Sequence, residues 1–228
     1  NRDIEEVEAL IDKVGELMFN FNYRSRWAVS NGQCIVDIDK LKELQTLARP
    51  EMKGAKEGEY YIGVDVARSA KTSNNASAIV VIRVRRDAKE RVRELQAVNV
   101  VKLPNGLNFK QQTVICKQMC ALYNAKAIVI DINGLGKGLL DYMLDRNILD
   151  DGTELEPYDM INTDYRSDYR DAKKLVYGIE AQKNNSEMIT NFINVVEGSI
   201  LRILEHFDLA KYFDMVCGSM VDMINNAY

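Results

Sequence analysis

The chain has 228 residues, of which 46% are hydrophobic, a formal net charge of -4 and a pI of about 5.3. This length suits one α/β domain with an appendage. No apolar run reaches the roughly 18 residues of a membrane-spanning helix, and no charged-then-apolar leader opens the chain, so we expect no membrane segment. The acidic balance argues against a general nucleic-acid binder. Four scattered cysteines and one histidine suggest neither a zinc site nor a disulfide framework, and they fit a reducing intracellular compartment.

The first part of the chain has the apolar spacing of a helix. Val7, Leu10, Val14 and Leu17 recur at intervals of three or four residues, which predicts mostly helical structure over residues 1–48. The chain opens without an initiator Met inside a charged helical pattern, so we interpret this part as the end of an upstream domain. Residues 49–58 are polar and turn-rich, which predicts a linker.

From residue 59 the pattern changes to short runs rich in β-branched residues. Three such runs separated by polar stretches predict an antiparallel meander over residues 60–66, 78–84 and 95–101. Beyond them we expect a helix at 109–123, a buried strand at 125–131, a helix at 134–143, a strand at 158–162, and helices at 168–181 and 187–205. This order resembles the RNase H-like fold, an α/β fold whose mixed five-stranded sheet has three antiparallel strands and then parallel strands, flanked by helices. We place this domain at residues 59–228.

Two of the predicted strands end in an aspartate. Asp65 follows the first strand and Asp131 follows the fourth, and in this layout the two strands are neighbours whose carboxyl ends lie close together. Crowded carboxylates repel one another, and bound divalent cations commonly offset that repulsion. Taken singly, each aspartate also suits a turn or helix cap. Together they predict a site for Mg²⁺ or Mn²⁺, in which a pair of ions would promote phosphodiester hydrolysis.

Two motifs resemble the nuclease domain of tailed-phage terminase large subunits. The first is Gly-Val-Asp-Val-Ala at 63–67, followed by Asn-Ala-Ser-Ala-Ile-Val-Val at 75–81, and the second runs from Val129 to Asp141. The aromatic segment at 21–27 is similar to the stretch that follows the ATPase domain in that family. The resemblance implies that Asp65 and Asp131 are metal ligands and that a C-terminal helix supplies a third carboxylate. Asp214 fits that position best, with Asp208 and Asp222 as alternatives.

Basic residues form two candidate DNA-contacting groups. The first lies between the second and third strands and the second lies near a predicted helix start: Arg83, Arg85, Arg86, Lys89 and Arg91, then Arg166, Arg170 and Lys173. Their functional interpretation is sequence-independent contact with phosphates. The alternative interpretation of the first group is the solvated face of a hairpin.

The glycines at 134, 136 and 138 follow Asp131 directly. A glycine-rich strand-to-helix turn can hold a phosphate, but the spacing lacks the last glycine of the dinucleotide fingerprint, and no ribose-binding acid follows. We expect these glycines to allow a tight turn and close approach of DNA or metal beside Asp131.

The resemblance implies an endonuclease that cleaves double-stranded concatemeric viral DNA during genome packaging in the host-cell cytoplasm. Its implied partners are an upstream ATPase domain of the same chain, a small terminase subunit and the portal protein. These 228 residues contain no Gly-x-x-x-x-Gly-Lys-Ser/Thr phosphate loop, so this piece does not drive translocation. One alternative is a nucleotide-binding domain of the actin and sugar-kinase type, which also places Gly-Val-Asp at its first strand. Another is a non-catalytic module that docks on the portal.

Overall fold

The computed structural model describes residues 36, 38–67 and 76–206. The expectations for residues 21–27 and for Asp208, Asp214 and Asp222 fall outside these residues. The chain divides into two compact units, residues 1–43 and 44–228. The described part of the first unit contains helix α3 (Ile38–Glu43). None of the described helices is long and apolar enough to cross a membrane.

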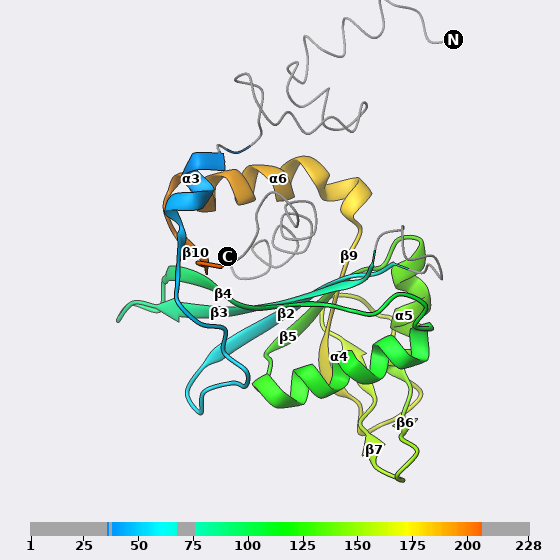
Figure 1. Cartoon of the computed structure of the whole chain (residues 1–228). Coiled ribbons are helices and arrows are strands. Elements are labelled where there is room, and N and C mark those ends of the chain that lie inside the picture. Colours follow the sequence, from blue (N-terminus) through cyan, green and yellow to red (C-terminus); the bar gives the residue numbers. More distant parts are fainter. Residues whose placement is uncertain (1–35, 37, 68–75, 207–228) are drawn as a thin grey trace, which may run out of the picture. The chain divides into compact units, whose positions relative to one another are not determined.

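The described part of the second unit is built on one eight-stranded mixed sheet (Figure 1). Its strands are β1 (Gln45–Leu47), β2 (Glu59–Asp65), β3 (Ala78–Arg86), β4 (Val92–Lys102), β5 (Ala127–Asp131), β8 (Tyr158–Met160), β9 (Lys173–Ile179) and β10 (Leu201–Leu204), in the order β1-β10-β4-β3-β2-β5-β9-β8. The strands β2, β3 and β4 are antiparallel neighbours, whereas β5 and β9 run parallel to β2. The central order β4-β3-β2-β5-β9 confirms the predicted RNase H-like sheet.

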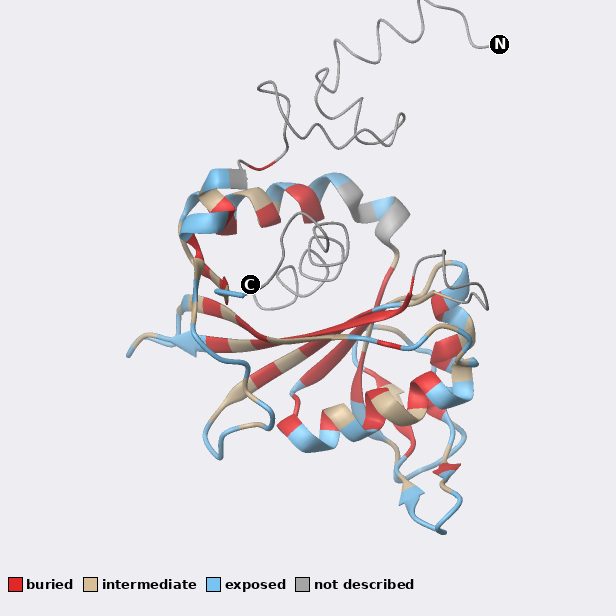
Figure 2. Cartoon of the chain, viewed as in Figure 1, coloured by how far each residue is buried: buried red, intermediate tan, exposed pale blue. Residues whose placement is uncertain are grey.

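Helices cover both faces of this sheet. α4 (Phe109–Tyr123) and α5 (Leu135–Leu144) lie on one face, and α6 (Ala181–Glu197) lies on the other (Figure 1). The core between the sheet and the first two helices takes alternate residues of the central strands, Tyr60, Ile62 and Val64 from β2 and Ile128 and Ile130 from β5 (Figure 2). Because successive side chains of a strand point to opposite faces, the residues between them point toward the α6 side.

The C-terminal part of the domain differs from the sequence prediction. The helix expected at 168–181 is wrong, because these residues contain the strand β9, which lies between β5 and β8. Its segment Leu-Val-Tyr-Gly-Ile is almost wholly buried, and a Cβ added at Gly178 would lie 2.5 Å from the Met160 side chain. The predicted strand at 158–162 is the outer strand β8 rather than the fifth strand of the core.

The other differences concern one edge of the sheet, where β10 and β1 lie. The helix expected at 187–205 is α6, which ends at Glu197. Gly198 and Ser199 then turn the chain, Ser199 with φ +54°, so that β10 pairs with β4. Beside β10, residues 45–47 form β1 and pair with it, although helix was expected there. Both short strands form their hydrogen bonds with residues that are distant in sequence. Local strand propensity therefore does not predict them.

Residues 49–58 connect β1 to β2 and are packed against the domain. The Glu51 N–H donates to the Val98 carbonyl at 3.0 Å, and the Gly54 N–H donates to the Leu122 carbonyl at 3.1 Å. The Glu51 carboxylate also pairs with Arg83 at 2.7 Å. The segment expected as a linker therefore has contacts to both the sheet and α4.

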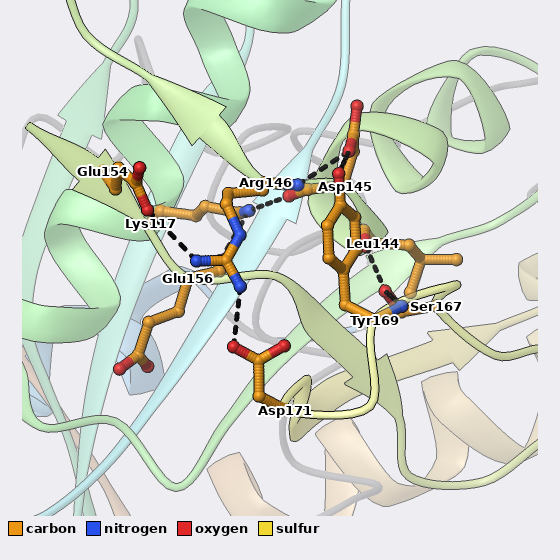
Figure 3. A network of polar contacts seen from close by, with 9 residues as sticks. All are labelled: Lys117, Leu144, Asp145, Arg146, Glu154, Glu156, Ser167, Tyr169 and Asp171. Carbon is orange, nitrogen blue, oxygen red and sulfur yellow. Dashed lines mark hydrogen bonds and ion pairs between the residues drawn. The ribbon is translucent and has the colours of Figure 1, made fainter. Parts of the chain in front are cut away.

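Lys117 is a buried cation that joins three parts of the domain (Figure 3). Its Nζ donates to the carbonyls of Asp145 at 2.6 Å and Glu156 at 2.7 Å, and it lies 5.1 Å from the centre of the Tyr158 ring. These two carbonyls flank the hairpin of β6 (Asn147–Ile148) and β7 (Glu154–Leu155). Lys117 thus ties both ends of the hairpin to α4. Desolvation by burial lowers the pKa of Lys117 to about 8.

The lowered pKa makes the contribution of Lys117 to stability depend on pH. Between its folded pKa of about 8 and its ordinary value of 10.5, the unfolded chain holds a proton that the folded chain has released. We expect the stability of the natural protein, relative to Lys117→Met, to rise with pH across this window by up to roughly 3 kcal/mol. Urea unfolding at several pH values measures this difference. Lys53→Met, at an exposed lysine, serves as the control, and a difference that stays constant with pH would contradict the expectation.

Candidate metal centre

Asp65 and Asp131 end two adjacent parallel strands. The last register pair of β2 and β5 is Val64 with Ile130, so the two aspartates are the next residues along each strand. Both are out of phase with the core-facing residues of their strands and therefore point to the α6 side of the sheet. Neighbouring strands lie about 4.8 Å apart, which places the two carboxylates side by side. Their role as metal ligands stays a prediction.

The electrostatics of the pair agree with this placement. Desolvation by the surrounding protein and, second, the charge of Asp131 raise the pKa of Asp65 above its ordinary value, although its side chain still reaches solvent. The Asp131 Oδ1 accepts a hydrogen bond from the Asn133 backbone N–H at 3.0 Å. Two like charges at adjacent strand ends favour a bound cation, because it removes their mutual repulsion.

A third ligand is not found among the described residues, which contain no group of three acidic, histidine or cysteine side chains able to hold a metal. Glu180 follows β9 at the same edge of the sheet and pairs with Lys183. The predicted third ligand, Asp214, lies outside the described residues. His206 follows β10, which is separated from β2 by β4 and β3.

Two buried polar residues fix the chain just beyond Asp65. The Ser77 hydroxyl accepts the Ala67 backbone N–H at 2.8 Å and lies within hydrogen-bonding distance of the Ala67 carbonyl and of the Gln112 Oε1. The Gln112 amide nitrogen donates to the carbonyls of Ala67 and Leu107. These contacts hold the exit of β2 against α4. Gln112 could not be recognised from the sequence. A polar residue in an amphipathic helix does not indicate which distant residue it will bond.

The three glycines after Asp131 have separate roles. Gly134 has φ +55°, a left-handed conformation that favours glycine, and it forms the turn into α5. A Cβ on Gly136 would lie 1.6 Å from the Asp131 carbonyl oxygen, and one on Gly138 would lie 2.5 Å from the Phe109 ring. The first two glycines therefore permit the expected tight turn beside Asp131. Since protein atoms fill the space beside the last two, the run does not form an open loop for a nucleotide phosphate.

Three lysines lie toward the same edge of the sheet as the aspartates. Lys102 ends β4 opposite Ala78, which in turn pairs with Asp65. Lys137 is in the first turn of α5, directly after the Asp131 loop, and Lys110 is in the first turn of α4, whose Phe109 contacts Gly138. All three side chains are exposed. No local sequence pattern marks these lysines, because they are scattered over 36 residues.

The basic group at the β3–β4 hairpin lies at the other end of the sheet. Glu59, at the start of β2, pairs with Val84, whereas Asp65 pairs with Ala78. Arg86 is eight residues beyond Ala78, or roughly 25 Å along the strand. Three of the five candidates are in ion pairs: Arg83 with Glu51, Arg86 with Glu59 and Arg91 with Asp87. The side chains of Arg85 and Lys89 are exposed.

The second basic group is also spread out. Lys173 begins β9, at the strand end opposite Ile179, which pairs with Asp131. Arg166 donates to the carbonyls of Thr163 and Tyr165, and Arg170 is exposed in the same loop. DNA contact by either basic group stays a prediction.

Known proteins with this fold were found by structure rather than by sequence. No protein-family profile and no curated protein matches the sequence. The Thermus phage P74-26 large terminase nuclease domain has 13% identity and a TM-score of 0.45, over 76% of this chain and 73% of that one. The large terminase nuclease from thermophilic phage G20c with bound zinc has 12% identity and a TM-score of 0.51, over 80% of this chain and 92% of that one. The chain described here therefore shares the fold of the phage G20c large terminase nuclease.

Proposed function

We propose that this chain is a metal-dependent endonuclease that cleaves double-stranded viral DNA during genome packaging. The observation that carries the proposal is the adjacent placement of Asp65 and Asp131 on one face of the sheet, at the carboxyl ends of parallel strands. Ligands of open α/β sheets bind outside these strand ends, where the chain connections diverge. The fold shared with a terminase nuclease supports the same conclusion, as do the two motifs at 63–67 and 129–141.

The donor atoms suit Mg²⁺ or Mn²⁺, because both ions prefer carboxylate oxygens. Asp65 and Asp131 would hold the metal, with Asp214 proposed as the third ligand of a two-ion site. Bound ions would supply a water activated for attack and neutralise charge on the scissile phosphate. Ser77 and Gln112 hold the backbone that follows Asp65, and Gly136 lets α5 pack directly against Asp131. The protein thereby orients both carboxylates before substrate binds.

The exposed lysines Lys102, Lys110 and Lys137 are proposed as phosphate contacts for DNA that enters at the aspartate edge. The first turns of α4 and α5 add the positive ends of two helix dipoles there. The hairpin residues Arg85 and Lys89 would contact only DNA that extends well beyond the scissile phosphate. We further propose, from the family resemblance, an upstream ATPase domain, a small terminase subunit and the portal as partners.

Removing either carboxylate is expected to abolish metal-dependent DNA cleavage. For Asp65→Asn and Asp131→Asn we expect at least roughly a 100-fold loss of Mn²⁺-dependent nicking of supercoiled plasmid, since each substitution removes an anionic metal ligand at constant size. Asp150→Asn, an exposed aspartate beyond α5, is the matched control and should keep its activity. Unchanged cleavage by Asp65→Asn would contradict the nuclease proposal.

Metal binding by the pair is expected to appear in stability as well as activity. Mn²⁺ should raise the thermal unfolding temperature of the natural protein and not that of Asp65→Asn. Without metal we expect Asp65→Asn to be more stable than the natural protein at neutral pH. The reason is that the raised pKa of Asp65 means that its ionisation destabilises the folded state. That advantage should disappear as the pH falls through the folded pKa of Asp65. Differential scanning fluorimetry with and without chelator measures both effects, and an equal Mn²⁺ shift in the two proteins would refute metal binding by Asp65.

The salt dependence of DNA binding distinguishes the two basic regions. Each lost phosphate contact lowers the slope of log affinity against log salt concentration by about 0.9 for duplex DNA. For Lys110→Gln with Lys137→Gln we expect a slope that is smaller by about 2 for a 10-base-pair duplex in Ca²⁺, which is too short to reach the hairpin when it is centred on the aspartates. Arg85→Gln with Lys89→Gln removes the same charge at the far end and should leave the slope unchanged. If only the second pair lowers the slope, DNA binds over the hairpin instead.

A further inference from the structure

The negative charge of the chain is concentrated in one described segment. Residues 141–171 contain ten acidic and three basic side chains, a net charge of -7, so the remaining residues together carry +3. This segment comprises the end of α5, the β6–β7 hairpin, β8 and the loop before β9. Such a concentration of negative charge repels nucleic acid and attracts cationic partners.

The same segment lines a cavity. A cavity of about 530 Å³ opens between the C-terminal half of α5 and the loop at 165–169. Its polar lining is composed of three carboxylates, two tyrosines, one arginine and one serine: Asp141, Asp145, Asp168, Tyr165, Tyr169, Arg166 and Ser167. The surplus of carboxylates leaves the cavity anionic.

Large apolar and aromatic side chains are exposed in the same segment. Of the eight exposed large hydrophobic residues in the described part of the chain, five lie in residues 141–171, including Tyr142, Tyr165 and Tyr169. The exposed fraction of Tyr165 is 52%. Aromatic rings that combine an apolar face with a hydroxyl are common at protein interfaces. Because Tyr165 and Tyr169 line the cavity, its wall combines exposed aromatic surface with negative charge.

Tyr169, which lines the cavity, also contacts a guanidinium of the chain that is not part of the cavity lining. Arg146 lies with its guanidinium carbon 5.2 Å from the centre of the Tyr169 ring and donates to Asp171 at 2.6 Å and to Glu154 at 3.1 Å (Figure 3). The Tyr169 hydroxyl donates to Asp145 at 2.9 Å, which orients both groups at the cavity wall. A ring face beside carboxylates is an arrangement that binds arginine by cation–π attraction and charge-assisted hydrogen bonds.

The loop that forms the cavity wall is held in place by its own contacts. The Ser167 hydroxyl donates to the Leu144 carbonyl at the end of α5, at 2.5 Å. The Ser167 N–H donates to the Asp159 carboxylate of β8 at 2.6 Å. Because the wall is anchored to a helix and a strand, a ligand does not have to order it on binding.

We propose that this acidic cavity docks an arginine or lysine side chain from a basic segment of a partner protein. The carboxylates of Asp141 and Asp168 would bind the cationic head, and the rings of Tyr165 and Tyr169 would cover its aliphatic stem. This surface is distinct from the aspartate edge, so one chain presents an anionic face to a protein and exposed lysines to DNA. The inference does not depend on the nuclease proposal.

A labelled peptide tests this docking surface on the full chain. The probe is a fluorescein-labelled heptapeptide with two arginines, and the reference peptide has citrulline at both positions. By fluorescence anisotropy we expect the arginine peptide to bind and the double variant Asp141→Asn with Asp168→Asn to bind it about 10-fold more weakly, since a hydrogen-bonded charge is lost. Tyr165→Ala should also weaken binding.

The matched control, Glu57→Gln with Glu187→Gln, removes the same charge at exposed sites outside the segment and should leave the peptide affinity unchanged. The proposal is overturned if the control weakens binding as much as the cavity variant, if the citrulline peptide binds equally well, or if no binding is measurable at millimolar peptide. Plasmid nicking by the cavity variant is measured in parallel, because its retention separates the two proposals.

Discussion

The parallel pairing of β2 with β5 is the constraint on which the rest of the domain depends. Four register pairs, from Tyr61 with Ala127 to Val64 with Ile130, align the two strands. A slip of one residue would turn one strand's apolar side chains away from the core, and one aspartate would leave the face that it shares with the other. The burial of Ile62 and Ile130 therefore stabilises the same register that brings Asp65 and Asp131 together.

The strand order also separates two surfaces of opposite charge. The aspartate edge has the exposed lysines at the ends of β4 and at the starts of α4 and α5, whereas the segment at 141–171 is strongly acidic. The net charge of the whole chain, -4, does not reveal this division. A nuclease that acts within a larger assembly requires contacts with both DNA and protein. The proposed functions assign each of these contacts to the surface whose charge attracts it.

Much of the first half of the domain was predictable because its signals are local. Short apolar runs rich in β-branched residues identified β2, β3 and β4, and helical spacing identified α4 and α5. The strand β9 was missed because its buried run is short and follows a polar, charged stretch, so neither period dominates. β10 was missed because its four residues directly follow a helix and are stabilised by pairing with β4.

By itself, the sequence determined the fold class and the two acidic strand ends, because apolar periodicity and strand order are encoded in nearby residues. Only the tertiary structure decided how the charged groups are used. Arg86 is bound to Glu59, 27 residues away, and the basic hairpin lies far from Asp65. The lysines of the aspartate edge and the walls of the acidic cavity likewise come from separate elements. Such contacts depend on the register and packing of the whole sheet, which no local pattern specifies.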